Sequence, residues 1–266
     1  MKKKIILIVI IFILLFLDIY LFFNFIYTRY KNKSFLEKHD ISLANDIQNS
    51  EFQIDKIIIY SSASGINKNT KFQRAYWQLD IFQYSDIAIY FKQPEILNES
   101  NSIRTLNISN IKCKVANEKY SPAVYYLDAN NFGTDTLVED YKIEDNIEYT
   151  VLNFDNQDNS IKYNTPVFFS DLSNPITLKF TNTLIKNHSI ENTEKLIFDG
   201  SLLSKTSLSK KDLEASISFN IDITNFKNEK YTANISIQIP LENNTQSIFD
   251  GSILNIQNTN LKFLKQ

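Results

Sequence analysis

Cysteine and histidine are scarce in this chain of 266 residues. Cys113 is the single cysteine, so no disulfide forms within the chain and the fold depends on its hydrophobic core. His39 and His188 are the only histidines, too few with one thiol for a zinc site built from Cys and His. We therefore expect no zinc centre.

Glycine and proline are also scarce, at four and five residues. Loops that approach a phosphate or a nucleotide closely need glycine, because a side chain blocks the approach. The G-x-S-x-G motif, which presents the nucleophile of many serine hydrolases, is missing from the sequence. These absences argue against an enzyme, and we expect no catalytic residue and no cofactor.

Long hydrophobic runs are missing except near the start, where residues 5–27 are interrupted only by Asp18 and Asn24. A helix of these 23 residues reaches about 35 Å, against a hydrocarbon core of about 30 Å. Three lysines precede the run, and the first alanine is Ala44, so the small-residue site for signal peptidase is lacking. The run therefore predicts an uncleaved signal anchor that spans the lipid bilayer once.

The anchor divides the chain into four parts. We predict a cytoplasmic flank at 1–4, a transmembrane helix at 5–27, a partly helical juxtamembrane stalk at 28–50 and an extracytoplasmic domain at 51–266. Basic residues lie on both sides of the span, so the orientation is inferred from the very short N-terminal flank, which is most simply retained inside. Residues 34–266 hold 22 basic and 29 acidic residues, a net charge of −7. An acidic domain does not attract nucleic acid, and we expect no such partner.

Asp18 lies inside the predicted span. Ionisable groups in a membrane usually face a partner or a polar cavity, so Asp18 is a candidate contact with another transmembrane helix. The alternative is that the span tolerates the Asp18 carboxyl without a partner. Inserting an aspartate near the helix centre costs about 3 kcal/mol, and each apolar residue of the span offsets about 0.3 to 0.6 kcal/mol of that cost.

From Phe52 onward the hydrophobic period is two, with Val, Ile, Thr, Tyr and Phe dominant. In "SISFNIDI", Ile217, Phe219, Ile221 and Ile223 alternate with polar residues, and "YTANISIQI" repeats the pattern. A break in the alternation of "WQLDIFQY" predicts a β-bulge. These patterns predict an all-β fold, an antiparallel β-sandwich of Ig-like or jelly-roll-like type. One sandwich or two is left open, with a seam at "KNHSIENTEK" as the candidate boundary.

A short motif occurs twice, as "IFDGSLL" from Ile197 and as "IFDGSIL" from Ile248. Asp-Gly between apolar residues is the strongest short signal for a hairpin with a type I′ turn. No matching pair of strands follows the second copy, so we predict one turn used twice rather than a duplicated domain. An acidic ligand-binding loop is the alternative.

The segment "DANNFGTDTLVE" resembles a calcium loop in its spacing. Asp128, Asn130, Gly133 and Glu139 fall on matching positions, and Asp128, Asn130 and Glu139 are therefore candidate metal ligands. Phe132 occupies a position that needs an oxygen ligand, and the flanks are predicted strands rather than helices. The alternative is an ordinary turn at Gly133.

Aromatic residues are plentiful, and Trp77 is the single tryptophan. Trp77 with Tyr76 and Tyr84 is a candidate stacking platform for sugar rings. The alternative, favoured by the alternation around it, is that Trp77 packs in the core.

The sequence thus predicts a membrane-anchored extracytoplasmic binding or assembly module without catalytic activity, which presents a β-sandwich to a protein partner or an envelope complex. This function predicts an exposed apolar patch or an unprotected edge strand on the domain. A glycan-binding or calcium-assisted adhesion domain is the first alternative. An envelope hydrolase with paired carboxylates is the second.

Overall fold

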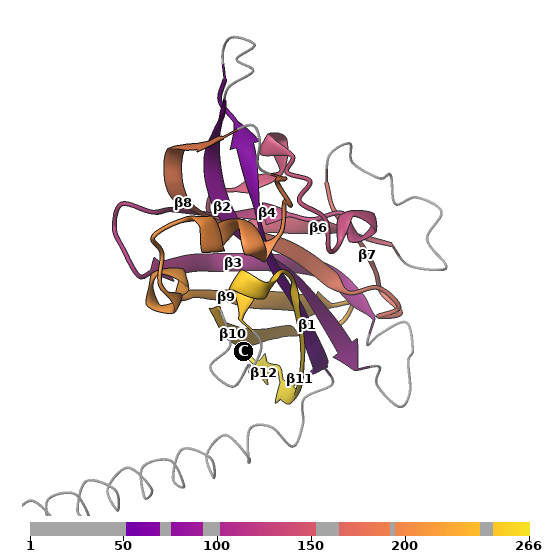
Figure 1. Cartoon of the computed structure of the whole chain (residues 1–266). Helices are drawn as coiled ribbons and strands as arrows, with labels where there is room; N and C mark the ends of the chain where they lie inside the picture. Colours follow the sequence, from indigo (N-terminus) through magenta and orange to yellow (C-terminus); the bar gives the residue numbers. More distant parts are fainter. Residues whose placement is uncertain (1–51, 70–75, 93–101, 153–164, 192–194, 240–246) are drawn as a thin grey trace, which may run out of the picture. The chain divides into compact units, whose positions relative to one another are not determined.

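The computed structural model describes residues 52–69, 76–92, 102–152, 165–191, 195–239 and 247–266. These residues are mostly in strands, and they form two six-stranded sheets (Figure 1). The prediction of an all-β, sandwich-like fold is confirmed. The predicted anchor at 5–27 and stalk at 28–50 lie outside the described residues.

The first sheet has the strand order β11-β1-β2-β8-β4-β5, and all its neighbouring strands are antiparallel. Its strands are β1 (Gln53–Asn67), β2 (Tyr76–Lys92), β4 (Ser121–Tyr126), β5 (Lys142–Ile143), β8 (Ile176–Glu191) and β11 (Ile253–Lys262).

The second sheet has the order β12-β10-β9-β3-β6-β7 and is antiparallel except between β6 and β7. Its strands are β3 (Ile103–Val115), β6 (Ile147–Leu152), β7 (Val167–Phe169), β9 (Ala215–Asn225), β10 (Lys230–Ile239) and β12 (Leu264–Lys265). Within the described ranges, five 3-10 helices connect the strands: η2 (Ala129–Asn131), η3 (Glu139–Tyr141), η4 (Gly200–Lys205), η5 (Lys210–Leu213) and η6 (Ile248–Asp250).

The main core lies between the sheets, because each strand turns alternate side chains inward. The predicted inward residues of β9 and β10 are all buried, and the two strands pair in register from Lys230 opposite Thr224 to Ile239 opposite Ala215. The first sheet contributes Ile57, Ile87 and Phe180 among others. The alternation of apolar and polar residues in the sequence therefore predicted the contribution of β9 and β10 to this core correctly.

A second apolar cluster covers the far ends of β1, β2 and β8 on the same face. Its strand residues include Ala63, Leu79 and Leu184, and three 3-10 helices cover them through Leu202, Leu203, Leu213 and Ile248. The first sheet thus packs on the second sheet at one end and on η4, η5 and η6 at the other.

A polar layer separates the two apolar clusters. Ser61, Gln83, Ser85 and Asn182 occupy inward positions between them and are all buried. The Ser61 and Ser85 hydroxyls lie 2.7 Å apart in a hydrogen bond, and Gln83 Nε2 donates to the Leu213 carbonyl at 3.2 Å. Within the described part of the chain, Gln83 Oε1 and both polar atoms of Asn182 have no hydrogen-bond partner.

A bulge occurs at the position along β2 where the sequence predicts one, but the extra residues belong to the neighbouring strand β8. The register of β2 with β8 shifts between Leu79 and Phe82, where β8 supplies the extra residues, and Asn187 on β8 has a φ of 55°. Both Ile81 and Phe82 are buried because each face of β2 is covered there. The suggested seam is not a boundary up to Glu191, since β8 continues to that residue.

The prediction of two type I′ hairpins is wrong. Gly200 begins η4, and Gly251 follows η6 with φ 128° and ψ −122°, outside the geometry of that turn. The two copies instead pack on each other, and the Gly200 amide donates to the Gly251 carbonyl at 3.1 Å. The two copies of the motif therefore contact each other as well as forming a local 3-10 turn each.

Candidate functional site

The edge strand β11 differs from the three other sheet edges. Among the described residues, the edge strands β5 and β12 have two residues each and β7 has three, whereas β11 has ten. β10 is also open from Ala233 to Ile239, because β12 pairs with it only at Tyr231 and Thr232, but its exposed residues there are polar: Asn234, Ser236 and Gln238. Short edge strands are one of the ways in which proteins avoid pairing with other chains. A long edge strand therefore marks the place where a further strand is able to add to this sandwich.

The exposed side of β11 is apolar. Leu254 and Ile256 are 59% and 61% exposed, the two largest values among the exposed large hydrophobic residues of the described chain. On the neighbouring strand, Tyr60 lies opposite Leu254 and Ile58 lies opposite Ile256, and both are half-buried. We call these four residues, Ile58, Tyr60, Leu254 and Ile256, the edge patch.

Residues 253–258 carry no charge, and a bulge ends this regular segment. The register of β1 with β11 shifts between Ile54 and Lys56 of β1. β11 has the extra residue there, and its Asn260 has a φ of 49°. Thr259 Oγ1 donates to the Ile54 carbonyl at 2.9 Å and fixes the bulge. The bulge twists the end of the strand, so the regular, uncharged part of the edge is six residues long.

The face of the first sheet that points away from the main core, where Tyr60 of the edge patch also lies, carries a buried ion pair. Asp86 on β2 and Lys179 on β8 are cross-strand neighbours, 0% and 2% exposed, with Nζ and Oδ1 2.5 Å apart. Burial raises the pKa of Asp86 and lowers the pKa of Lys179, while the attraction between the two charges opposes both shifts. Lys179 Nζ also lies 4.4 Å from the ring centroid of Tyr84.

Residues 127–136, which we call the strap, are held on this face by the ion pair. The Gly133 amide donates to Asp86 Oδ2 at 2.7 Å, and Lys179 Nζ donates to the Thr134 carbonyl at 2.8 Å. The hydroxyl of Ser64, on β1, donates to Asp135 Oδ2 at 2.7 Å. The pair therefore satisfies its own charges and fixes the strap at the same time.

The predicted calcium ligands lie on or next to this strap. Asp128 Oδ1 accepts from the Asn130 backbone at 2.9 Å and from its side chain at 3.0 Å, which caps η2. Gly133 adopts a φ of +82°, and Glu139 begins η3. No cluster of three or more His, Cys, Asp or Glu that could hold a metal ion occurs in the described ranges. These contacts give Asp128 and Gly133 local roles, and calcium binding stays a prediction.

The predicted aromatic platform is not assembled. Trp77 is half-buried against the second apolar cluster, and its neighbour Tyr76 points to the opposite face of β2 and is exposed. Tyr84 is buried beside the ion pair, and this burial raises its pKa. The structure brings Tyr84 together with Lys179 and Tyr60 rather than with Trp77.

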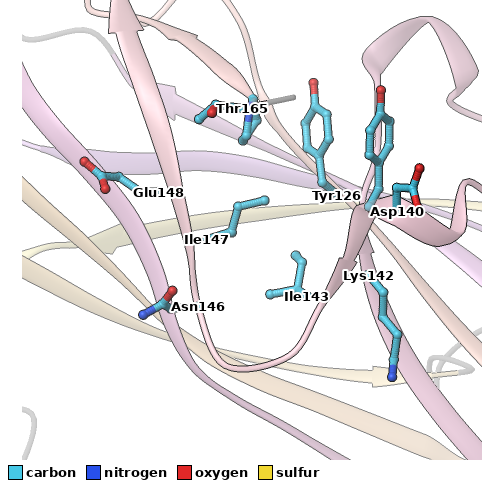
Figure 2. Close-up of a pocket in the computed structure, with 10 residues that line it drawn as sticks. Tyr126, Asp140, Lys142, Ile143, Asn146, Ile147, Glu148 and Thr165 are labelled. Atoms are coloured by element: carbon cyan, nitrogen blue, oxygen red, sulfur yellow. The ribbon is translucent and has the colours of Figure 1, made fainter. Parts of the chain in front are cut away.

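A pocket of about 300 Å³ is lined by residues that flank the strap in the sequence, Tyr126 before it and residues from Asp140 onward after it (Figure 2). Tyr126 and Tyr141 line this pocket, and their ring centroids are 5.3 Å apart. Ile143 and Ile147 form an aliphatic part of the lining between Tyr126 and Asn146. Its polar lining is Asp140, Lys142, Asn146, Glu148 and Thr165. Aromatic and aliphatic walls with a few polar groups are typical of sites for small ligands.

Cys113 lies in β3, as its sequence context predicts. It is half-buried, and desolvation raises the pKa of its thiol to about 11. The thiolate is therefore rare at neutral pH, which fits a packing role rather than a reactive one.

The candidate membrane contact Asp18 lies outside the described residues. None of the helices in the described part of the chain has the length and hydropathy of a membrane span.

Sequence reasoning missed the ion pair and the edge patch. Asp86 in "SDIAIYF" and Lys179 in "ITLKF" are single charges inside otherwise apolar strands, and that pattern is a usable signal for a buried pair. Leu254 and Ile256 carry no such signal, because only the strand order shows that β11 is an edge.

Comparison of the chain with protein-family models, with curated proteins and with solved structures finds no match.

Proposed function

We propose that this chain is a membrane-anchored extracytoplasmic binding or assembly module that presents its β-sandwich to a protein partner or an envelope complex. The observation that carries the proposal is the edge strand β11 with Leu254 and Ile256 exposed at its regular end. The sequence had led us to expect a feature of this kind for a binding module.

Strand addition explains why this edge suits a protein partner. Alternate residues of an edge strand leave their backbone N–H and C=O groups unpaired, and an incoming strand satisfies them. Leu254 and Ile256 add specificity, since burying such a side chain completely contributes about 1.5–3 kcal/mol. Backbone pairing and two apolar contacts together favour an extended, uncharged partner segment.

The membrane anchor belongs to the same proposal. Residues 5–27 span the bilayer, residues 1–4 stay in the cytoplasm, and the domain from residue 51 lies outside. The net charge of −7 after residue 33 supports a protein partner over nucleic acid. We assign the sandwich to an Ig-like or jelly-roll-like class, supported by the antiparallel pairing of nearly all its strands.

The proposal includes no catalysis, because the described carboxylates with shifted pKa values have structural partners. Asp86 pairs with Lys179. Asp212 closes the capping box of η5 with Ser209, and Glu229 binds Lys265. Each of these groups stabilises a local structure rather than facing a substrate.

A photo-crosslinking residue placed at Ile256 of the full chain, in cells, tests this proposal. We expect discrete protein adducts at position 256. The matched control is position 218, since Ser218 is a half-exposed residue of β9, a strand of the other sheet with neighbours on both sides. Equal adduct patterns at both positions, or none at either, contradict a binding role for the β11 edge.

The pocket between Tyr126 and Tyr141 favours glycan binding as a second candidate function. Tyrosine rings stack on sugars, and Asp140, Asn146 and Glu148 supply hydrogen-bonding groups in the lining of the pocket. With a panel of soluble oligosaccharides as the probe, Tyr141→Ala should weaken binding about tenfold or more. The control is Tyr76→Ala, an exposed tyrosine outside this pocket, and an equal loss in both variants would contradict sugar binding in the pocket.

A further inference from the structure

We propose that the partner of β11 is a second copy of this chain, paired antiparallel around a two-fold axis at Asn255. This inference rests on the proposed function, because it names the occupant of the same edge. Its product is a symmetric dimer in which the first sheets of two copies join into one continuous sheet.

The edge patch is self-complementary in this register. A two-fold axis through the Asn255 pair sets Leu254 of one copy opposite Ile256 of the other, and the reverse contact follows by symmetry. Both side chains lie on the same face of β11, since they are two residues apart. Directly opposed residues in an antiparallel pair have Cβ atoms about 4.5–5.5 Å apart, so the four exposed side chains cover one another.

The charges around the segment also favour an antiparallel copy. Residues 253–258 carry no charge that would repel a second copy. Asp250 precedes the segment and Lys262 follows it. Antiparallel pairing places the acidic end of one strand beside the basic end of the other, whereas parallel pairing would place like charges together.

The area of contact fits association on a membrane. In this register residues 253–257 of one copy pair with residues 257–253 of the other, and these five residues per strand bury less surface than a standard protein–protein interface of about 1,600 Å². Two chains anchored in one bilayer meet at a high effective concentration, which compensates for a small interface. We therefore expect a dimer in the membrane that dissociates when the protein is diluted in detergent.

Cysteine cross-linking of the full chain in its membrane tests the register. In a Cys113→Ser background, Asn255→Cys should give a disulfide-linked dimer, because the two thiols meet on the axis. The matched control is Asn258→Cys on the same strand, whose two copies would lie about 20 Å apart at about 3.4 Å per residue. Adding Leu254→Lys and Ile256→Lys to Asn255→Cys should reduce the dimer about tenfold or more, since lysines then oppose each other.

The outcomes separate this inference from the proposed function. A dimer at position 255 and none at position 258 supports the pairing. Equal dimer at both positions overturns the register, and adducts of Asn255→Cys only with a different protein overturn the second copy while leaving a binding role for the edge. No adduct of any kind at position 255 overturns the inference, and the photo-crosslinking experiment at Ile256 then decides the proposed function separately.

Discussion

Gly200 is the glycine at which an added side chain would lie closest to neighbouring atoms. A Cβ built on Gly200 lies 1.6 Å from the Ile248 carbonyl oxygen and 2.0 Å from that of Gly251. Both obstacles are backbone atoms of the second copy of the motif, so they cannot move aside as a flexible side chain would. The close approach of two backbone segments therefore requires glycine at position 200.

Gly200→Ala should lower the free energy of unfolding by about 4 kcal/mol or more, because the helices η4 and η6 must separate. Denaturant unfolding of the wild type and the variant measures this loss. The control is Gly133→Ala, where nothing lies within 4 Å and only the φ of +82° is unfavourable, which costs about 1–2 kcal/mol. Equal losses for the two variants would contradict the close approach at Gly200.

The pair of Asp86 and Lys179 should behave as a unit. Lys179→Met alone leaves a buried carboxylate without its charged partner and should cost about 3–5 kcal/mol. Adding Asp86→Asn to that variant should recover part of the loss, because the amide oxygen still accepts from Gly133. A double-mutant cycle by denaturant unfolding measures the coupling, and losses that simply add would contradict it.

At the scale of the element, the strands follow from the sequence more fully than their connections do. Alternation in "SISFNIDI" and "YTANISIQI" identified β9, β10 and their buried faces, because burial of one face imposes a period of two. The 3-10 helices η4, η5 and η6 were not predicted. They depend on packing over the far ends of β1, β2 and β8, and no local pattern encodes that contact.

The candidate sites show the same division. The spacing of Asp128, Asn130 and Glu139 matched a calcium loop, but Asp128 caps η2 and Gly133 binds Asp86 on a distant strand. Trp77 and Tyr84 are close in sequence, yet strand alternation places them on opposite faces of β2. The contacts of Gly133 and Tyr84 come from other strands, which sequence proximity does not show, and calcium binding stays a prediction.

The C-terminal strand β12 should give the fold an acid-sensitive anchor. Glu229 accepts hydrogen bonds from Lys265, Asn225 and Tyr231, which lower the pKa of its carboxyl from 4.5 to about 2. Because the folded-state pKa is the lower one, this stabilisation is present above pH 4.5 and is lost as the pH falls towards 2.

Glu229→Gln should therefore flatten the fall in Tm between pH 4.5 and pH 2, which thermal unfolding at a series of pH values measures. Above pH 5 the variant should be less stable than the wild type, since the ion pair with Lys265 is lost. An unchanged acid limb in the variant would show that other carboxylates determine it.

At the scale of the whole molecule, the proposed topology has residues 5–27 in the membrane and the sandwich outside it. Protease added to intact cells should remove the domain from residue 51 onward and leave an anchored fragment. Protection in intact cells that disappears on lysis would place the domain in the cytoplasm and contradict the proposed orientation.

The architecture also explains why one edge is available for binding. Among the described residues, three of the four edge strands have only two or three residues, and the fourth has a six-residue regular segment with Leu254 and Ile256 exposed. β10 is also open beyond the two residues that pair with β12, but it exposes only polar residues there. The class of fold was predictable from strand patterns. The identity of the edge was not, because β11 pairs with β1 across nearly the full length of the domain sequence.

The central claim is that β11 pairs with another strand when the protein is in its membrane, and amide hydrogen exchange tests it most directly. Exchange of the full chain should be compared between membranes and a dilute detergent solution, with β9 as an internal reference in the second sheet. The account predicts that alternate amides of residues 253–258 exchange slowly in the membrane and quickly after dilution, while β9 is unchanged. Equal exchange of these amides in both states would contradict it.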